Sequence, residues 1–395
     1  MSLSCEVADE VSIPQHAAWG AVLSMAFGVF GLITAEFLPV SLLTPIADSL
    51  QITEGQAGQT VTVTALLALL TSLFIGPLTR RTDRRVMMLS FSLLMVASCL
   101  MVALATNLPL LLAARVLLGI AIGGFWTLST AIAMRLVPTK DVPRALSIVF
   151  SGVSLSTIIA APLASYLGGL IGWRDIFMLA AALGVLGFIW QYFTLPSMPP
   201  KIAANAAGAF GLLRRSVMRW GMLTAAMIFS AHFAFFTYMR PFIETAVNHD
   251  LSQLSLILLA FGVSNFVGTL LAGVLLSRHI ALTLSGAALL MAIIALVLTQ
   301  VGDMAGFLAV GVAFWGLTFG VIPPGWSTWI ARVVPDEAEA GGGLLVASIQ
   351  SAISVGAAAG GWLYDGQGAV GLFWGSGIMM LLAAFFLYSR VRQSG

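Results

Sequence analysis

GLITAEFLPVSLLTPIADSL, residues Gly31–Leu50, decides how the chain folds, because it places one carboxylate inside a long apolar run. Residues 17–35 hold no charge before Glu36, and Leu, Pro and Val follow it. A charge inside a bilayer costs roughly 2.5–3.5 kcal/mol on insertion scales, so such residues are usually paired, protonated or functional. We therefore expect Glu36 either to handle protons or to tie two helices together.

The whole chain is too apolar for a soluble domain. Of its 395 residues, 59% are hydrophobic and 9% are charged, and the mean hydropathy is +1.01. Soluble domains carry about 25% charged residues. The 40 glycines suit helices that pack closely in lipid. The composition predicts an all-α membrane protein whose surroundings are the lipid bilayer.

The cysteines and histidines do not form a reactive or metal-binding pattern. Cys5 lies in the N-terminal tail, Cys99 lies in an apolar run, and the four histidines do not group with acids inside an apolar run. We therefore expect no cofactor, no metal and no disulfide framework. The first sixteen residues lack the basic segment of a secretory signal, so we expect the first apolar run to be retained.

Apolar runs long enough to span a bilayer, about 20 residues each, recur twelve times. We expect spans at 17–44, 54–77, 85–106, 108–134, 143–171, 174–196, 217–246, 252–277, 280–301, 304–331, 339–363 and 368–390. The polar break at 197–216 divides the chain at its midpoint. We expect a cytoplasmic tail at 1–16, a six-helix half at 17–196, a cytoplasmic linker at 197–216 and a second half at 217–395.

The cations fix the orientation of these spans. If the N-terminus is cytoplasmic, all of the 18 Lys and Arg residues lie on the inner side except Arg115, Arg174 and Arg240. The opposite orientation would violate the positive-inside rule. We therefore expect both termini in the cytoplasm.

The two halves repeat each other. Gly76-Pro-Leu-Thr-Arg-Arg81 and Gly273-Val-Leu-Leu-Ser-Arg278 end corresponding spans, as do Arg135-Leu-Val-Pro138 and Arg332-Val-Val-Pro335. Both pairs are offset by 197 residues, half the chain. Because each half begins and ends on the same side, the repeats are parallel, about an axis along the membrane normal.

Two six-helix halves in parallel repeat resemble the major facilitator superfamily. That family has a Gly-x-Leu-x-Asp-Arg-x-Gly-Arg-Arg loop after its second span, and here the loop reads GPLTRRTDRR. Gly76, Arg84 and Arg85 match the pattern, whereas Arg80 replaces the acid and Asp83 replaces the second glycine. The resemblance implies a gating role for this loop, with Asp83 as a substitute acid; an arginine cluster that only anchors the hairpin is the alternative.

Further motifs narrow the resemblance to the drug/proton antiporter branch. Arg115 and Gly119 match the branch's intramembrane arginine motif in the fourth span, and Pro162 is what remains of the antiporter signature in the fifth. GGFW at 123–126, GWRDIF at 172–177, FFTYMRPF at 235–242 and WGLTFGVIPPGWSTWI at 315–330 resemble bacterial purine ribonucleoside efflux transporters. The resemblance implies export of such nucleosides by alternating access, driven by proton entry.

Glu36 on the first span and Arg115 on the fourth are the expected proton-coupling pair. By residue count both lie in the outer half of the bilayer. A pair across the gap between the spans would reduce the cost of burying each charge. Because Arg does not deprotonate, the carboxyl is the group that titrates.

The resemblance implies that the first, fourth, seventh and tenth spans line the central cavity. Aromatic side chains on these spans, and amides on the eighth and eleventh, are the expected substrate contacts, because a purine offers a flat π-face and a hydrogen-bonding edge. We expect contacts from Trp126, His232, Phe236, Asn265, Trp315, Trp326 and Gln350. Packing tryptophans, a core histidine and amides that join helices are the alternatives. Arg240, Glu244, His249 and Asp250 are expected to form a solvated rim at the outer mouth.

Other classes of protein fit the sequence less well. Sugar efflux and broad drug efflux by the same mechanism are the nearest alternatives, but an aromatic, amide-bearing cavity favours a base, and a broad drug pump would more often carry several intramembrane acids. A membrane enzyme would need clustered nucleophile or metal residues. The duplicated halves argue against a channel or receptor, and no ATP-binding loop is present. We expect a monomer whose partners are protons and a small substrate, with no nucleic acid.

Overall fold

The computed structural model describes residues 17–79, 81–138, 141–199, 211–301, 304–334 and 337–391. Across these ranges the chain is helical throughout, with no strand. The predicted tail at 1–16 lies outside the described residues, as does most of the predicted linker. The fold is therefore all-α, as the composition predicts.

The first half of the chain forms seven helices. They are α1 (Trp19–Ser41), α2 (Leu43–Leu50), α3 (Glu54–Leu78), α4 (Arg84–Ala103), α5 (Leu108–Leu136), α6 (Val142–Ile171) and α7 (Trp173–Thr194). The second half, after the short turn η2 (Leu212–Arg214), has α9 (Ser216–Thr237), α10 (Met239–Ala246), α11 (Leu251–Arg278), α12 (Ile280–Val301), α13 (Ala305–Val333), α14 (Ala338–Phe386) and the π-helical end η4 (Leu387–Val391). Each half has its own apolar core.

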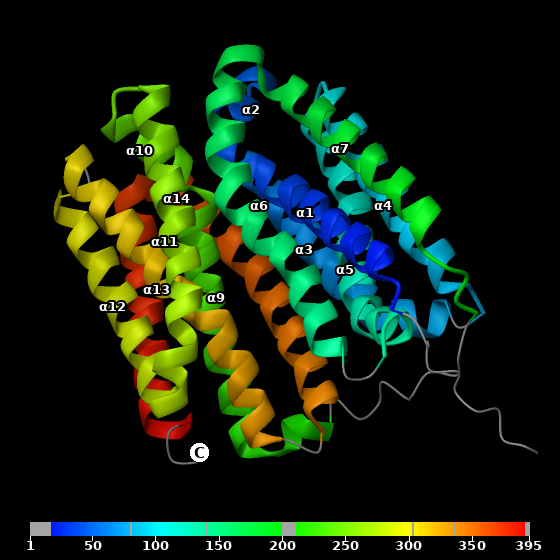
Figure 1. The fold of residues 1–395 in the computed structure, drawn as a ribbon. Coiled ribbons are helices and arrows are strands. Elements are labelled where there is room, and N and C mark those ends of the chain that lie inside the picture. The colour runs from blue at the N-terminus through cyan, green and yellow to red at the C-terminus, as the bar shows by residue number, and fades with distance from the viewer. Residues whose placement is uncertain are drawn as a thin grey trace, which may run out of the picture.

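Among the described residues, 11 helices are long and apolar enough to cross a membrane. The last of them, α14, has 49 residues and contains one non-helical residue, Gly368, with φ 65°. At 1.5 Å per residue it would extend about 70 Å, more than twice the bilayer core of about 30 Å. Its orange first part and red second part run as separate helices in Figure 1. The predicted spans 339–363 and 368–390 are therefore both present, although the break between them is a single glycine turn.

The first and seventh predicted spans are each broken near one end of the helix bundle. The span expected at 17–44 divides at Leu42 into α1 and α2, and the span expected at 217–246 divides at Tyr238 into α9 and α10. Prolines accompany both breaks, Pro39 within α1 and Pro241 within α10. Because proline lacks an N–H and its ring crowds the carbonyl four residues earlier, it weakens a helix where it lies.

The two halves meet along α3 with α14 and along α6 with α11. Hydrogen bonds also join them at the end that carries α2 and α10, which lies at the top of Figure 1, opposite the C-terminus. There the Asp365 carboxylate accepts bonds from the Thr53 hydroxyl at 2.6 Å and from the Gly55 N–H at 2.9 Å. The Tyr238 hydroxyl donates to the Ala357 carbonyl at 2.9 Å.

Close helix packing within each half depends on glycines. A Cβ added at Gly123 of α5 would lie 2.2 Å from the Ala68 carbonyl oxygen of α3, whereas one added at Gly286 of α12 would have nothing within 4 Å. Backbones that approach this closely leave no space for a side chain, as is common where helices pack in lipid.

We expect Gly123→Ala to lower the thermal stability of the detergent-solubilised protein, because α3 and α5 must separate to admit the methyl group. Overpacking of this kind costs about 1–3 kcal/mol. Gly286→Ala is the matched control and should leave the melting temperature unchanged or slightly higher. Equal melting temperatures for the two variants would contradict the packing described here.

Candidate functional site

Arg115 is fully buried on α5 and binds the backbone of α1. Its Nη1 donates to the Ala35 carbonyl at 2.9 Å, its Nη2 to the Glu36 carbonyl at 3.2 Å and its Nε to the Thr64 hydroxyl at 3.0 Å. Pro39 explains the first bond. In a helix the N–H of residue 39 would bind the carbonyl of residue 35, and proline has no N–H. Arg115 supplies the missing donor.

The Glu36 side chain is half-buried on α1, beside the carbonyls that Arg115 holds. Within the described part of the chain it forms no ion pair, so Arg115 and Glu36 meet through the backbone rather than through the carboxylate. In place of the ion pair expected between Glu36 and Arg115, this structure has hydrogen bonds from Arg115 to the backbone of α1. Three of the five guanidinium N–H groups bond the Thr64 hydroxyl and the two α1 carbonyls, and none of these bonds reaches the Glu36 carboxylate.

His232, Phe236 and Trp315 come together in one buried cluster. The Trp315 indole donates from Nε1 to His232 Nδ1 at 3.0 Å, which requires that nitrogen to be unprotonated. The His232 ring stacks on Phe319 with centroids 3.3 Å apart and on Phe236 at 5.4 Å. Phe236 also meets Phe37 of the other half edge-on at 5.5 Å. The cluster thus extends from the second-half core to the residue beside Glu36.

The remaining aromatic and amide candidates are dispersed. Trp126 is half-buried on α5 and stacks on Phe150 of α6, with centroids 5.3 Å apart. Trp326 is fully buried on α13 against Trp329. The Asn265 amide donates to the Gly316 carbonyl at 3.3 Å, so it joins α11 to α13. Gln350 is buried on α14.

Asp83 joins the loop before α4 to the segment after α7. Its Oδ1 accepts the Arg85 N–H at 2.7 Å as the cap of α4, its Oδ2 accepts the Ser197 hydroxyl at 2.5 Å, and the Met198 N–H bonds both oxygens at 3.0 Å. Burial alone would raise the pKa of Asp83, but the bonds from Ser197, Met198 and Arg85 outweigh it, and the pKa lies below its usual value. Arg85 belongs to the first half, whereas Ser197 and Met198 begin the predicted linker, so Asp83 joins that half to the start of the linker.

The other residues expected to take part in conformational gating lie on α3, α4 and α6. Arg84 is buried and its Nη1 donates to the Thr79 carbonyl at 3.1 Å, and Arg85 donates to the Tyr192 carbonyl at 2.6 Å. Gly76 lies near the end of α3, and Pro162 lies half-buried inside α6. The described side-chain contacts of Arg84 and Arg85 lie within the first half, and the Arg84 N–H bonds the Met198 carbonyl just after it at 3.0 Å.

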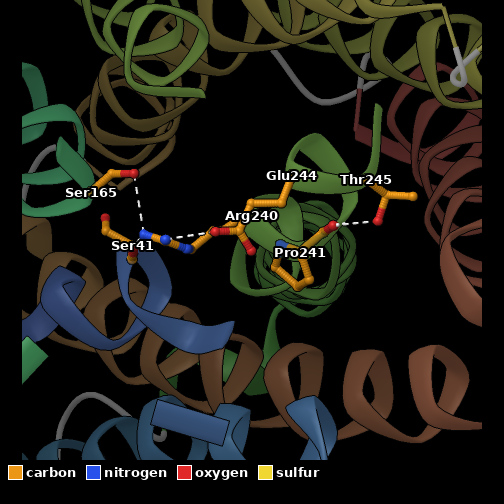
Figure 2. A network of polar contacts seen from close by, with 6 residues as sticks. All are labelled: Ser41, Ser165, Arg240, Pro241, Glu244 and Thr245. Carbon is orange, nitrogen blue, oxygen red and sulfur yellow. Dashed lines mark hydrogen bonds and ion pairs between the residues drawn. The ribbon is translucent and has the colours of Figure 1, made fainter. Parts of the chain in front are cut away.

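The end that carries α2 and α10 holds charged residues that are buried, which corrects the expectation of a solvated rim for Arg240 and Glu244. They are 2% and 5% exposed and form an ion pair at 2.6 Å. Figure 2 shows Arg240 extending from α10 toward the end of α1, where Nη1 binds the Ser41 carbonyl and, at 3.1 Å, the Ser165 hydroxyl of α6. His249 and Asp250 are exposed, as expected. The sequence signal for this ion pair was the four-residue spacing of Arg240 and Glu244, which makes the two side chains neighbours on a helix.

Two halves of apolar spanning helices, joined at one end around buried charges, define a multi-pass membrane transporter. A family model described as Major Facilitator Superfamily matches residues 25–342 and 241–394. The chain belongs to the major facilitator superfamily. This membership confirms the predicted fold class and the predicted resemblance, and it places the chain among transporters rather than enzymes.

Relatives with assigned names are similar over nearly the whole chain. The chain is 47% identical over 385 residues to the purine ribonucleoside efflux pump NepI of Salmonella enteritidis and to that of Salmonella typhimurium, covering 98% of this chain and 96% of each relative.

Solved structures share the fold at low sequence identity. A D-xylose-proton symporter has a TM-score of 0.77 at 17% identity, with 95% of this chain and 98% of that chain covered. A bacterial homologue of the human lysosomal transporter Spinster, in an inward-facing and occupied conformation, has a TM-score of 0.75 at 15% identity, with 95% and 96% covered.

We expect Asp83→Asn to lower stability at neutral pH, because the amide replaces an acceptor of several hydrogen bonds. Asparagine can still cap α4 through its one side-chain oxygen, so the variant loses the second acceptor and the charge, and hydrogen bonds to charged groups contribute about 1.5–3 kcal/mol. Since the folded-state pKa is lowered, the stabilisation is present above about pH 4 and disappears as the pH falls through the folded-state value. Thermal unfolding of both proteins along a pH series should therefore converge at acid pH. Asp48→Asn, at an exposed carboxylate near the end of α2, is the control.

Proposed function

We propose that this protein is a proton-coupled antiporter that exports purine ribonucleosides, such as inosine or guanosine, from the cytoplasm. The observation that carries the proposal is 47% identity along 98% of the chain to relatives named purine ribonucleoside efflux pump. Lone Glu36 beside Arg115 supports proton coupling, because an isolated intramembrane acid is usually functional. Sugar efflux or broad drug efflux by the same mechanism is the alternative.

The proposed cycle is alternating access in the bacterial inner membrane, with both termini cytoplasmic. With that orientation, α2 and α10 lie on the outer side, and the bonds of Arg240 and Asp365 between the halves close that side. The described state is then inward-facing. An inward-facing transporter is poised to take substrate from the cytoplasm and to release a proton there.

In this proposal Glu36 carries the proton and Arg115 supplies a fixed positive charge. A neighbouring cation favours the carboxylate, and removal from water favours the neutral acid. Because Arg115 is held by backbone carbonyls, its position does not depend on the protonation of Glu36. Access to water from one side and then the other would therefore control when the proton binds and leaves.

The proposed substrate contacts divide into two groups. Trp126 is half-buried and offers a ring face for stacking, whereas His232, Trp315 and Trp326 are buried and support the cavity wall from behind. Phe236, Asn265 and Gln350 supply the remaining aromatic and amide surface. A nucleoside needs both kinds of contact, one for the base plane and one for the base edge or ribose hydroxyls.

We expect Glu36→Gln to abolish uphill transport while leaving the protein folded, because glutamine keeps the size of the side chain and removes the titrating proton. The measurement is inosine uptake into everted membrane vesicles with an acidic interior. Downhill exchange of inosine should survive in the variant.

Glu54→Gln is the matched control for this test, since Glu54 is an acid in the first turn of α3. It should retain uphill transport with the same dependence on the pH gradient as the parent protein. If Glu36→Gln also retains that dependence, Glu36 is not the coupling carboxyl.

We expect Trp126→Ala to weaken inosine binding roughly tenfold or more, because stacking of a base on an aromatic ring contributes about 1–3 kcal/mol. Trp126→Phe keeps an aromatic face and should retain most of the affinity. Trp326→Ala should instead lower thermal stability, since deleting a buried tryptophan costs about 3–5 kcal/mol. Equilibrium binding to purified protein separates the two effects, and unchanged affinity in Trp126→Ala would refute the stacking role.

A further inference from the structure

His232 lies on α9 with one of its two ring nitrogens already bonded. The Trp315 indole donates from Nε1 to His232 Nδ1 at 3.0 Å. An indole N–H is a donor and offers no acceptor, so Nδ1 must present its lone pair to it. A neutral imidazole carries its single proton on the other nitrogen. The bond from Trp315 therefore fixes the tautomer of His232 and makes Nε2 an N–H donor.

This Nε2 donor has no acceptor within the part of the chain that the structure describes. There the bond from Trp315 is the hydrogen bond of His232, and Nε2 makes none. Unlike the indole nitrogen of Trp326, which is enclosed by the protein, Nε2 borders open space, although His232 as a whole is only 2% exposed. The ring thus supports the cavity wall, and its Nε2 edge is the part that a bound molecule can reach.

Aromatic neighbours hold the His232 ring in one plane. Phe319 stacks on it with centroids 3.3 Å apart and an interplanar angle of 1°, and Phe236 stacks on it at 5.4 Å and 15°. Phe233 meets it edge-on at 5.1 Å. An imidazole N–H lies in the plane of its ring, so the stack and the Trp315 bond together fix the direction of Nε2–H. A donor with a fixed direction recognises an acceptor at one place.

A flat base with an acceptor in its own plane matches such a donor. Guanine and adenine both present the N7 nitrogen as an acceptor on one edge, whatever group stands at position six. On the corresponding edge a pyrimidine presents carbon C5 with its hydrogen or methyl group. A base bonded through N7 would extend the plane of the imidazole. Phe236, which stacks on that plane and meets Phe37 of the first half at 5.5 Å, would then border the base.

We propose that His232 selects purines by donating from Nε2 to N7 of the base, and that Trp315 is the positioning residue that fixes the His232 tautomer. The proposal deepens the proposed function and rests on its purine substrate. It names the atom of the substrate that the protein recognises. Because N7 is common to purines with an oxo or an amino group, this contact separates purines from pyrimidines and does not separate one purine from another.

The first test compares inosine with 7-deazainosine, in which a C–H group replaces N7, by equilibrium binding to the purified full chain in lipid nanodiscs. The parent protein should bind 7-deazainosine about tenfold or more weakly than inosine, because the analogue leaves a buried donor without an acceptor. Equal affinities would overturn the proposal and leave the proposed function standing. Failure to bind inosine at all would refute the proposed function, and this inference with it.

His232→Asn removes the Nε2 donor, and its amide oxygen can still accept from Trp315 in place of Nδ1. Inosine should bind this variant about tenfold more weakly, whereas 7-deazainosine should bind it as tightly as the parent. A third ligand, 3-deazainosine, keeps N7 and should lose affinity as inosine does. Equal losses for inosine and 7-deazainosine in the folded variant would overturn the N7 contact.

Two further variants control this result. His232→Gln places an amide N–H near the position of Nε2, so it should retain a preference for inosine over 7-deazainosine that His232→Asn lacks. His279→Asn makes the same exchange at an exposed histidine that follows α11, and it should leave all three affinities unchanged. A preference that is equally absent from His232→Gln and His232→Asn would contradict a role for the donor.

Nitrogen NMR of histidine-labelled protein tests the role of Trp315. The signals that disappear in His232→Asn identify His232, and in the parent they should show Nδ1 unprotonated and Nε2 protonated. Trp315→Phe keeps an aromatic ring and removes the indole donor, so both tautomers should become populated and the preference for inosine over 7-deazainosine should fall. Protonated Nδ1 in the parent, or unchanged His232 signals in folded Trp315→Phe, would overturn the positioning role.

Discussion

The structure depends on satisfying the backbone carbonyls at the end of α1 in a place where lipid supplies no hydrogen bonds. Pro39 removes the donor for the Ala35 carbonyl, and the helix end leaves the Ser41 carbonyl without one. Arg115 from the same half binds the first, and Arg240 from the other half binds the second. In hydrocarbon a carbonyl without a hydrogen-bond donor costs several kcal/mol. The two arginines therefore stabilise α1 at the two carbonyls that lack a donor from their own helix.

The same solution recurs in the second half with neutral groups. Pro324 in α13 removes the donor for the Gly320 carbonyl, and the Thr269 hydroxyl of α11 binds that carbonyl at 3.0 Å. A hydroxyl fixes one helix to another, whereas a guanidinium does so and also leaves a charge nearby. This difference separates the α1 end, where charge is concentrated, from Pro324 inside the continuous helix α13, where the described contact is neutral.

Hydropathy and charge position predict the spans, the halves and the family because these depend on the bilayer, which acts on every residue alike. The burial of Arg240 and Glu244 could not be predicted in that way. They lie near the end of a span, where a charge is ordinarily hydrated, and only the approach of the first half removes water from them. Likewise, Arg115 was expected to meet a carboxylate, because a linear sequence does not show that Pro39 has freed a closer acceptor.

The attachment of Arg115 to main-chain oxygens has a consequence for how such proteins diverge. A cation that recognises carbonyls accepts any amino acid at position 36, since every residue there presents the same carbonyl. The acid can therefore be gained or lost without disturbing the helix contact. Under the proposed function, in which Glu36 carries the proton, descendants of such a fold could lose proton coupling by a single substitution at this position.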